Sequence, residues 1–399
     1  MERLTMNEKK KLTRLTAKRY HKARKRDKRT ILNEFIHSTG YHRTYAAFVL
    51  RNECKTVRIG RRNAFKGDLR VKSHHKRETI YGEAVVKALK FIWKLMDFIC
   101  GKRLKPILSE AINNLERFEI ISFDDEVKQK LLSISPATID RKLKKERKKL
   151  ELKGRSHTKP GNLLKHQIQI KTFADWNDIV PGFVEVDLVS HDGGNSSGEF
   201  CFSLDMTDVE TQWVESSAIR NKAQIWTVKA IDKAKGNLPF KLLGLNSDNG
   251  SEFINTHLLK YCESGHITFT RSRSNKKNDN CYVEQKNFSV IRNAVGYNRY
   301  DTDEELNILN ELYGYLRLYT NHFQPAMKLK EKHRNGAKLY KSYAIAKTPY
   351  QRVMEHDKVP NENKNVLKGI HENLNLYELK SNITECQRKL LLLHKKKYG

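Results

Sequence analysis

The sequence predicts an α/β fold: a mixed five-stranded sheet flanked by helices and preceded by all-α domains. Two observations support this class. The first 150 residues show helical periodicity with few strand-like runs, whereas from residue 183 onward strand-like runs alternate with turns and helical segments. The change in texture follows GRSHTKPGN (154–162), which has the composition of a loop. Three hairpin-spaced strands followed by β/α alternation indicate a mixed sheet with helices on its faces.

The charge balance of the chain indicates the kind of partner. Its 399 residues include 77 Lys and Arg against 46 Asp and Glu, a formal net charge of +31. This excess points to a polyanion, with nucleic acid first. An anionic membrane is the rival, but the most apolar helical segment, VVKALKFIWKLMDFIC (85–100), is interrupted by four charged residues and is not expected to span a bilayer.

The N-terminal segment and the cysteines indicate the cellular compartment. The N-terminus MERLTMNEKKKLTRL lacks an apolar stretch, so no signal peptide is predicted. The six cysteines are scattered without a C-x-x-C pair, which favours a reducing compartment and argues against a Cys-rich zinc site. We therefore expect a cytoplasmic protein without a membrane partner.

A first helical domain is expected over residues 1–75. Its segment ILNEFIHSTGYHRTYAAFVLRN (31–52) shows two apolar-faced helical patterns around a Gly-containing turn, which is typical of a helix-turn-helix unit. The candidate recognition helix would present Tyr41, Arg43 and Arg51 to DNA. An ordinary helical hairpin is the alternative, and the flanking basic residues favour DNA. The basic stretch 53–80 is expected to be a linker or arm.

A second helical domain with a similar pattern is expected over residues 76–155. Ser135 is placed to cap a helix that has Pro136 at its first position, a strong start signal. That helix would present Arg141, Lys142 and Lys145 to DNA. A solvated basic helix face is the alternative interpretation of these charges.

The predicted sheet belongs to a core domain at 178–325. Strands are expected at 183–189, 198–206, 211–219, 240–246 and 266–272, with helices at 221–236, at 254–264 and from residue 278 onward. The remaining residues, 326–399, are expected to form a small module and a helical basic tail. In that tail Leu379, Ile383, Cys386, Leu390 and Leu393 repeat at heptad spacing, which fits either dimerisation or packing on the same domain.

Three carboxylates occupy distinctive positions in this core. Asp187 lies in the first strand, Asp248 ends the fourth, and Glu284 lies in the last helix with 35 residues between it and Asp248. Because the first and fourth strands are neighbours in a sheet of this order, we expect Asp187 and Asp248 to face each other, with the helix bringing Glu284 over both. Each alone would be an ordinary paired or solvated acid. Asp192, Asp205 and Asp208 are interpreted as turn residues, and His191 as a turn or surface residue.

Such a cluster suits phosphodiester chemistry. Two Mg²⁺ ions activate the attacking oxygen and stabilise the leaving oxygen, and carboxylates are the ligands that Mg²⁺ takes. Without a cation, three converging carboxylates would repel one another and at least one pKa would rise. The pattern therefore predicts a divalent-metal site that acts on nucleic acid.

Three segments carry a resemblance to a known family: FVEVDLVSHDGG (183–194), LNSDNGSEFIN (245–255) and NKKNDNCYVEQKN (275–287). They closely resemble the signature segments of integrase-type DDE transposases, bacterial insertion-sequence enzymes related to retroviral integrases. The resemblance runs from the first helix-turn-helix to KTPYQRV (347–353). It implies an RNase H-like core in which Asp187, Asp248 and Glu284 form the catalytic triad and hold two Mg²⁺ or Mn²⁺ ions.

Further roles follow from this resemblance. Asn280 and Asn287 share the helical face of Glu284 and would hold DNA or orient the carboxylate. Basic residues around the site would contact phosphates: Arg271, Arg273, Lys276, Lys277, Lys286 and Arg292. The N-terminal domains would recognise the terminal inverted repeats of the mobile element.

The resulting expectation is a nucleoid-associated bacterial DDE transposase. It would bind double-stranded DNA at the element ends, cut a 3′ end and transfer that strand to target DNA as a homo-oligomer in a synaptic complex. Two alternatives stay open: an RNase H-like nuclease without strand transfer, and a DNA-binding regulator or domesticated transposase without turnover. The regulator predicts a lost triad member, and all three carboxylates are present.

Overall fold

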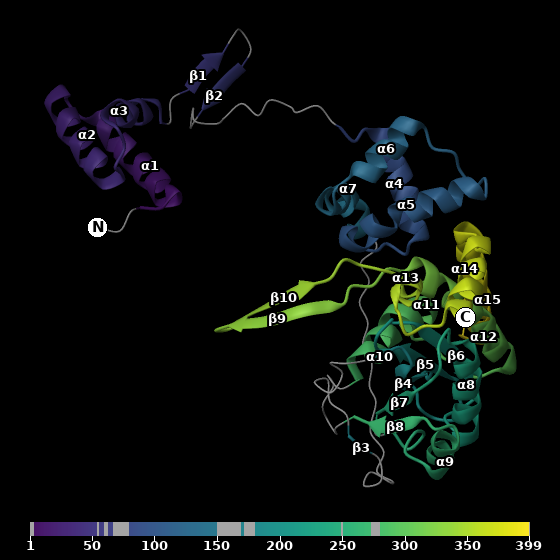
Figure 1. The fold of residues 1–399 in the computed structure, drawn as a ribbon. Coiled ribbons are helices and arrows are strands. Elements are labelled where there is room, and N and C mark those ends of the chain that lie inside the picture. Colours follow the sequence, from purple (N-terminus) through teal and green to yellow (C-terminus); the bar gives the residue numbers. More distant parts are fainter. Residues whose placement is uncertain are drawn as a thin grey trace. The chain divides into compact units, whose positions relative to one another are not determined.

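Two units make up the chain. The computed structural model describes residues 4–53, 56–59, 63–66, 80–149, 169–170, 180–248, 250–272 and 280–398. By internal packing it divides into Met1–Thr79 and Ile80–Gly399 (Figure 1). Among the described helices, none is both long enough and apolar enough to cross a membrane.

The N-terminal unit is built on three helices: α1 (Met6–Lys22), α2 (Lys25–Thr39) and α3 (Arg43–Asn52). Phe35, Ala46 and Leu50 belong to the apolar core between them. Gly40 ends α2 with a φ of 64°, a left-handed conformation that glycine adopts without strain, so α3 begins after a short turn. The predicted helix pair is therefore present. The stretch expected to be an arm contains a hairpin, β1 (Thr56–Ile59) and β2 (Asn63–Lys66).

The second unit begins with four helices: α4 (Glu83–Leu95), α5 (Gly101–Arg117), α6 (Asp125–Ser133) and α7 (Pro136–Lys148). The hydroxyl of Ser135 accepts a hydrogen bond of 3.2 Å from the amide of Thr138, with Pro136 at the first position of α7, which confirms the predicted start of this helix. Leu89, Leu108 and Leu143 of these helices share one apolar cluster with residues of the C-terminal helices.

A mixed sheet of strand order β3-β8-β7-β4-β5-β6 forms the centre of this unit. Its strands are β3 (Gln169–Ile170), β4 (Phe183–Ser190), β5 (Phe202–Asp208), β6 (Val214–Ile219), β7 (Gly244–Ser247) and β8 (Thr268–Arg271). β4, β5 and β6 form an antiparallel meander, and β3, β8, β7 and β4 are parallel. The five predicted strands are present, and the two-residue β3 adds a sixth at the edge.

Successive side chains of β4 point to opposite faces of the sheet, and each face is covered by a different layer of helices. Val184 and Val186 pack in the cluster that includes residues of α8 (Gln224–Asn237) and α9 (Thr256–Ser264). The intervening side chains, Glu185, Asp187 and Val189, lie on the opposite face, since successive strand residues point to opposite faces. Figure 1 shows α10 beside the sheet near β4 and β5. The carboxylates of β4 therefore face the helical layer that contains Glu284.

That layer contains a continuous helical stretch and a long helix. α10 (Cys281–Lys286) runs into a π-helical turn, η3 (Asn287–Arg292), and ends as α11 (Asn293–Val295). α12 (Asp303–Phe323) packs against β6, where the side chain of Asn321 bonds both the amide and the carbonyl of Val214 at 2.9 and 2.8 Å.

The C-terminal elements are β9 (Leu329–Asn335), β10 (Lys338–Tyr343), α13 (Pro349–Glu355), α14 (Asn361–Asn373) and α15 (Leu376–Tyr398). Four residues of the predicted heptad seam, Leu379, Ile383, Cys386 and Leu390, are buried in the same cluster as Leu312 of α12. The seam therefore packs within its own unit, one of the two expected uses.

Candidate active site

Asp187 and Asp248 come to one end of the parallel pair β4–β7. The register pairs Val186 with Ser247, and each of the two aspartates follows its paired residue directly. The predicted adjacency of these strands is confirmed. The amide of Leu188 donates a hydrogen bond of 2.8 Å to Asp187 Oδ1, and the amide of Gly250 donates one of 2.8 Å to Asp248 Oδ1.

Glu185, which was not among the predicted site residues, anchors α10 to β4. Its Oε2 accepts hydrogen bonds from the backbone amides of Tyr282 at 2.8 Å and Val283 at 2.9 Å. A helix N-terminus leaves such amides without intrahelical acceptors, and a carboxylate there also interacts favourably with the helix dipole. The sequence could have indicated Glu185 through its spacing of two residues from Asp187, which puts both acids on one face of the strand.

Two further contacts fix the same helical stretch along β4. The side-chain amide of Asn287 donates a hydrogen bond of 2.6 Å to Asp187 Oδ2. The guanidinium of Arg292 donates one of 2.8 Å to the carbonyl of Ser190 and another of 3.2 Å to that of Gly296. Glu284 is thus carried by a helix that is tied to β4 at Glu185, Asp187 and Ser190.

The carboxylates influence one another electrostatically. Burial raises the pKa of Asp187 to about 7, and the negative charges of Asp248 and Glu284 add to the rise. Burial raises the pKa of Glu185 to about 8, with contributions from Glu284 and Asp187. Burial also raises the pKa of Asp248. Like charges and burial both disfavour the ionised form of these carboxyl groups, so a nearby cation would stabilise that form.

Glu284 is the outermost of the three. Its side chain is exposed, whereas Asp187 and Asp248 are half-buried. Within the described ranges, no three His, Cys, Asp or Glu side chains lie close enough together to hold one metal ion. The three carboxylates therefore share one site electrostatically without converging on a single point in this conformation.

Asp205 and His191 differ from their expected places. Asp205 is not a turn residue: it lies inside β5, fully buried and directly opposite Asp187. Burial raises its pKa well above the ordinary value, and the charge of Lys286 opposes this. His191 is also fully buried, with Nε2 2.7 Å from the hydroxyl of Ser203. Asp208 does serve a turn, since its carboxylate accepts hydrogen bonds from both the amide and the hydroxyl of Thr211.

Three of the predicted DNA contacts lie on the N-terminal unit. Arg43 and Arg51 of α3 are exposed, and Arg43 donates a hydrogen bond of 2.7 Å to Asn33. Tyr41 is half-buried, its ring 5.0 Å from that of Tyr45. Lys9 lies over the Tyr41 ring at 5.1 Å. Lys9 and Arg43 thus lie near the start of α3, and Arg51 lies in its last turn.

The predicted contacts on α7 differ in exposure. Arg141 and Lys145 are exposed, and Arg141 donates a hydrogen bond of 2.8 Å to Thr138. Lys142 is half-buried and bonds the carbonyl of Tyr81 at 3.0 Å.

Near the carboxylates, the predicted contacts are mostly covered. Arg271 is 8% exposed, Asn280 is buried with its Oδ1 2.6 Å from Asn246 Nδ2, and Lys286 is half-buried. Burial lowers the pKa of Lys286 to about 8, with the charge of Arg103 adding to the effect. Asn287 and Arg292 are engaged with β4 as described above. Arg273, Lys276 and Lys277 lie outside the described residues.

No family model matches this chain. The uncharacterized protein y4rM of Sinorhizobium fredii is 37% identical over 341 residues, which are 86% of this chain and 93% of that protein.

Solved structures similar to part of the chain are retroviral. The integrase catalytic core domain of HTLV-2, in complex with magnesium, covers 37% of this chain and 92% of its own at 18% identity, with a TM-score of 0.28. The catalytic core domain of BIV integrase covers 43% and 91% at 15% identity, with a TM-score of 0.29. Likeness at this level carries no weight for function.

Proposed function

We propose that this chain, which belongs to the same family as the uncharacterized protein y4rM of Sinorhizobium fredii, is a DDE transposase that cuts a DNA 3′ end and joins it to target DNA. The supporting observation is the meeting of Asp187 and Asp248 at the end of β4–β7, beside a helix that carries Glu284 and is bonded to Asp187 through Asn287. The three signature segments around these residues point to the same family of reactions.

The donor set fits divalent metal ions. Asp187, Asp248 and Glu284 offer hard carboxylate oxygens, which suit Mg²⁺ and Mn²⁺. The raised pKa values of Asp187 and Asp248 mark a site whose negative charge a cation offsets. These three residues would hold a pair of divalent ions, which would activate the attacking oxygen and stabilise the leaving oxygen.

Other groups of the chain orient these ligands. Leu188 and Asn287 each donate to one oxygen of Asp187, which fixes the plane of the carboxylate. Gly250 does the same for one oxygen of Asp248. Glu185 holds the first turn of α10, and with it the backbone position of Glu284. Partners of this kind commonly contribute 10–100-fold to metal affinity or activity.

The reaction has two displacements at phosphorus. A water oxygen attacks the phosphorus at the element end, the bond from phosphorus to the 3′ oxygen breaks, and a 3′-hydroxyl is released. That hydroxyl then attacks a phosphorus of the target strand, whose own 3′ oxygen leaves. No covalent bond between protein and DNA is required. Because two DNA ends must be held together, the working form is a homo-oligomer in which α3 and α7 contact the inverted repeats.

Joining of a pre-cut end tests the function. A duplex that carries the terminal sequence of the encoding element, already cut at its 3′ end, is incubated with a target plasmid and Mg²⁺ or Mn²⁺. Joined product is expected from the wild type and from Asp192→Asn, a matched change in an acid outside the triad, but not from Asp248→Asn. DNA binding without joining by the wild type in either metal would overturn the proposal in favour of a regulator.

A further inference from the structure

The hairpin β9–β10 is a separate two-stranded ribbon of the second unit. Among the described strands, these two pair only with each other, and they are joined by a two-residue loop in which Gly336 has a φ of 58°. Figure 1 shows it extending away from the sheet and helices of its unit. An isolated two-stranded ribbon is at best marginally stable in water, so it needs either a firm base or a partner.

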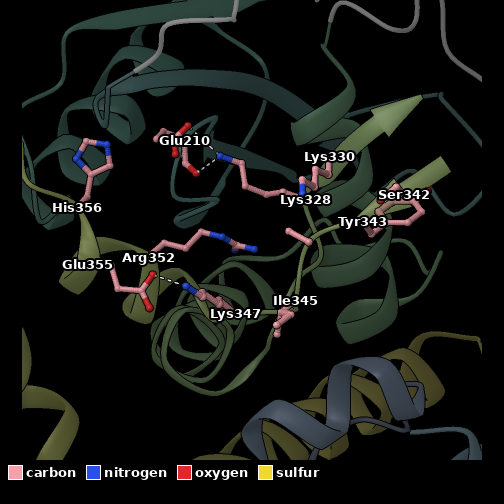
Figure 2. Close-up of a pocket in the computed structure, with 11 residues that line it drawn as sticks. Glu210, Lys328, Lys330, Ser342, Tyr343, Ile345, Lys347, Arg352, Glu355 and His356 are labelled. Carbon is pink, nitrogen blue, oxygen red and sulfur yellow. Dashed lines mark hydrogen bonds and ion pairs between the residues drawn. The ribbon is translucent and has the colours of Figure 1, made fainter. Parts of the chain in front are cut away.

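The base of the ribbon is held firmly by ion pairs and hydrogen bonds. Lys328 Nζ bonds the carbonyl of Glu210 at 2.7 Å and its carboxylate at 2.9 Å. Lys347 Nζ lies 2.6 Å from the carboxylate of Glu355, and Arg352 donates a hydrogen bond of 2.6 Å to the carbonyl of Ala326. Figure 2 shows these groups converging from the hairpin stem, the β5–β6 turn and α13.

These groups line a cavity of about 720 Å³ at the stem. Four Lys and Arg side chains line it against two acids, and Lys328 and Lys347 are the two that pair with Glu210 and Glu355. The remaining lining cations are Arg352 and Lys330, and Lys330 begins a run of basic residues along the strands. The stem thus serves as a rigid mount for the ribbon, and the partner surface is the ribbon itself.

The strands carry a dense and one-sided charge. The segment 329–343 contains five Lys and Arg residues against one acid, Glu331. Lys330, Arg334, Lys338 and Lys341 are exposed, and within the described part of the chain no ion pair involves any of the four. Tyr340 and Tyr343 are also exposed, at 55% and 47%. Exposed cations interleaved with aromatic rings are typical of a nucleic-acid contact.

We infer that the β9–β10 ribbon is a DNA-binding element that contacts the phosphates of double-stranded DNA. A two-stranded ribbon has the width that the major groove of B-DNA admits. A second copy of the chain fits less well, because its formal net charge of +31 opposes the approach of a basic ribbon. The inference relies on the proposed function only for the choice of DNA as the polyanion.

Salt-dependent binding to duplex DNA tests the inference without any chemistry. Fluorescence anisotropy of a labelled 40-base-pair duplex is measured with the full chain in EDTA over a range of KCl concentrations. The ribbon variant combines Lys330→Gln, Arg334→Gln, Lys338→Gln and Lys341→Gln. The control removes the same charge from exposed lysines elsewhere in the unit: Lys222→Gln, Lys368→Gln, Lys395→Gln and Lys396→Gln.

For the ribbon variant we expect the slope of log K against log [KCl] to become shallower by about 2–4, since each phosphate contact contributes roughly 0.9. The control should change it by about 1 or less. A variant with Lys330→Arg, Lys338→Arg and Lys341→Arg keeps the charge and should bind as the wild type does, which separates the effect of charge from that of changing the side chains. Equal slopes for the ribbon variant and the control would overturn the inference. So would a ribbon variant that binds DNA normally but no longer self-associates in sedimentation, since the ribbon would then contact a second copy of the chain. Because EDTA prevents joining, either result is independent of whether the chain is a transposase.

Discussion

The carboxylate of Glu185 accepts a hydrogen bond of 2.9 Å from the backbone amide of Val283, so a strand residue fixes the start of the helix that carries Glu284. Asp187 stands two residues further along β4 on the same face, and Glu284 directly follows Val283. One buried carboxylate thus helps to set the spacing between two proposed metal ligands.

This anchor predicts a difference between two substitutions of Glu185. Glu185→Ala should lower the free energy of unfolding by about 2 kcal/mol, because the buried amide of Val283 and the partly buried amide of Tyr282 lose their acceptor. Glu185→Gln should lower it by less than about 1 kcal/mol, since glutamine keeps an acceptor and resembles the largely protonated carboxyl expected when its pKa is about 8. Urea denaturation at pH 7 measures both. A loss in Glu185→Ala no larger than the loss in Glu185→Gln would contradict this role of the Glu185 acceptor.

Raised carboxyl pKa values predict a pH-dependent response to metal. The folded-state pKa of Asp187, about 7, exceeds its ordinary 3.8, so folding favours the protonated form. This stabilisation is present at low pH and is lost as pH rises through about 7. Mn²⁺ competes with the proton for the Asp187 carboxylate, so it should raise Tm more at pH 8, where the proton is mostly lost, than at pH 6. The difference should vanish in Asp187→Asn and persist in Asp192→Asn; the same Mn²⁺ response in both variants would contradict the site.

The contact between Asn287 and Asp187 predicts a selective loss of rate. Asn287→Ala removes the donor that orients Asp187 Oδ2, and we expect joining to fall about 10–100-fold with DNA affinity unchanged. Asn293→Ala, an exposed change in the same helical stretch, is the control and should join normally. A parallel fall in DNA affinity would instead assign Asn287 to DNA binding.

Packing of α15 within its own unit predicts an intramolecular effect on stability. Ile383→Ala, at a site 1% exposed, should lower the free energy of unfolding by about 2–4 kcal/mol. Leu391→Ala, at a site 48% exposed, should change it by less than about 0.5 kcal/mol. Neither midpoint should depend on protein concentration. A midpoint for the wild type that rises with concentration would show that the seam also mediates dimerisation.

Much of the fold could be predicted because its signals are local. The alternation of strand and helix patterns predicted five of the strands and the adjacency of β4 and β7, and Ser135 with Pro136 located the start of α7. The two-residue β3 has no such signal, since it is too short for a period of two to appear in the sequence.

The parts that were missed depend on pairing between distant residues. Asp205 lies near the end of the expected strand 198–206, so it was interpreted as a turn residue; only the register of β5 places it opposite Asp187. In the sequence, Glu185 occupies an ordinary polar position of an alternating strand. Its role as an anchor of α10 depends on amides almost one hundred residues away. The exposed ribbon at 329–343 lacks the alternating apolar pattern from which a strand is recognised.

The most direct test of the central claim is strand transfer by three single variants measured side by side: Asp187→Asn, Asp248→Asn and Glu284→Gln, each with Mg²⁺ and with Mn²⁺. If the three carboxylates act as one metal-binding unit, each change should reduce joining by at least about 10³-fold, with DNA binding and Tm in EDTA close to those of Asp192→Asn. Joining retained by any one of the three, at a rate near that of the wild type, would contradict the triad and remove that residue from the site.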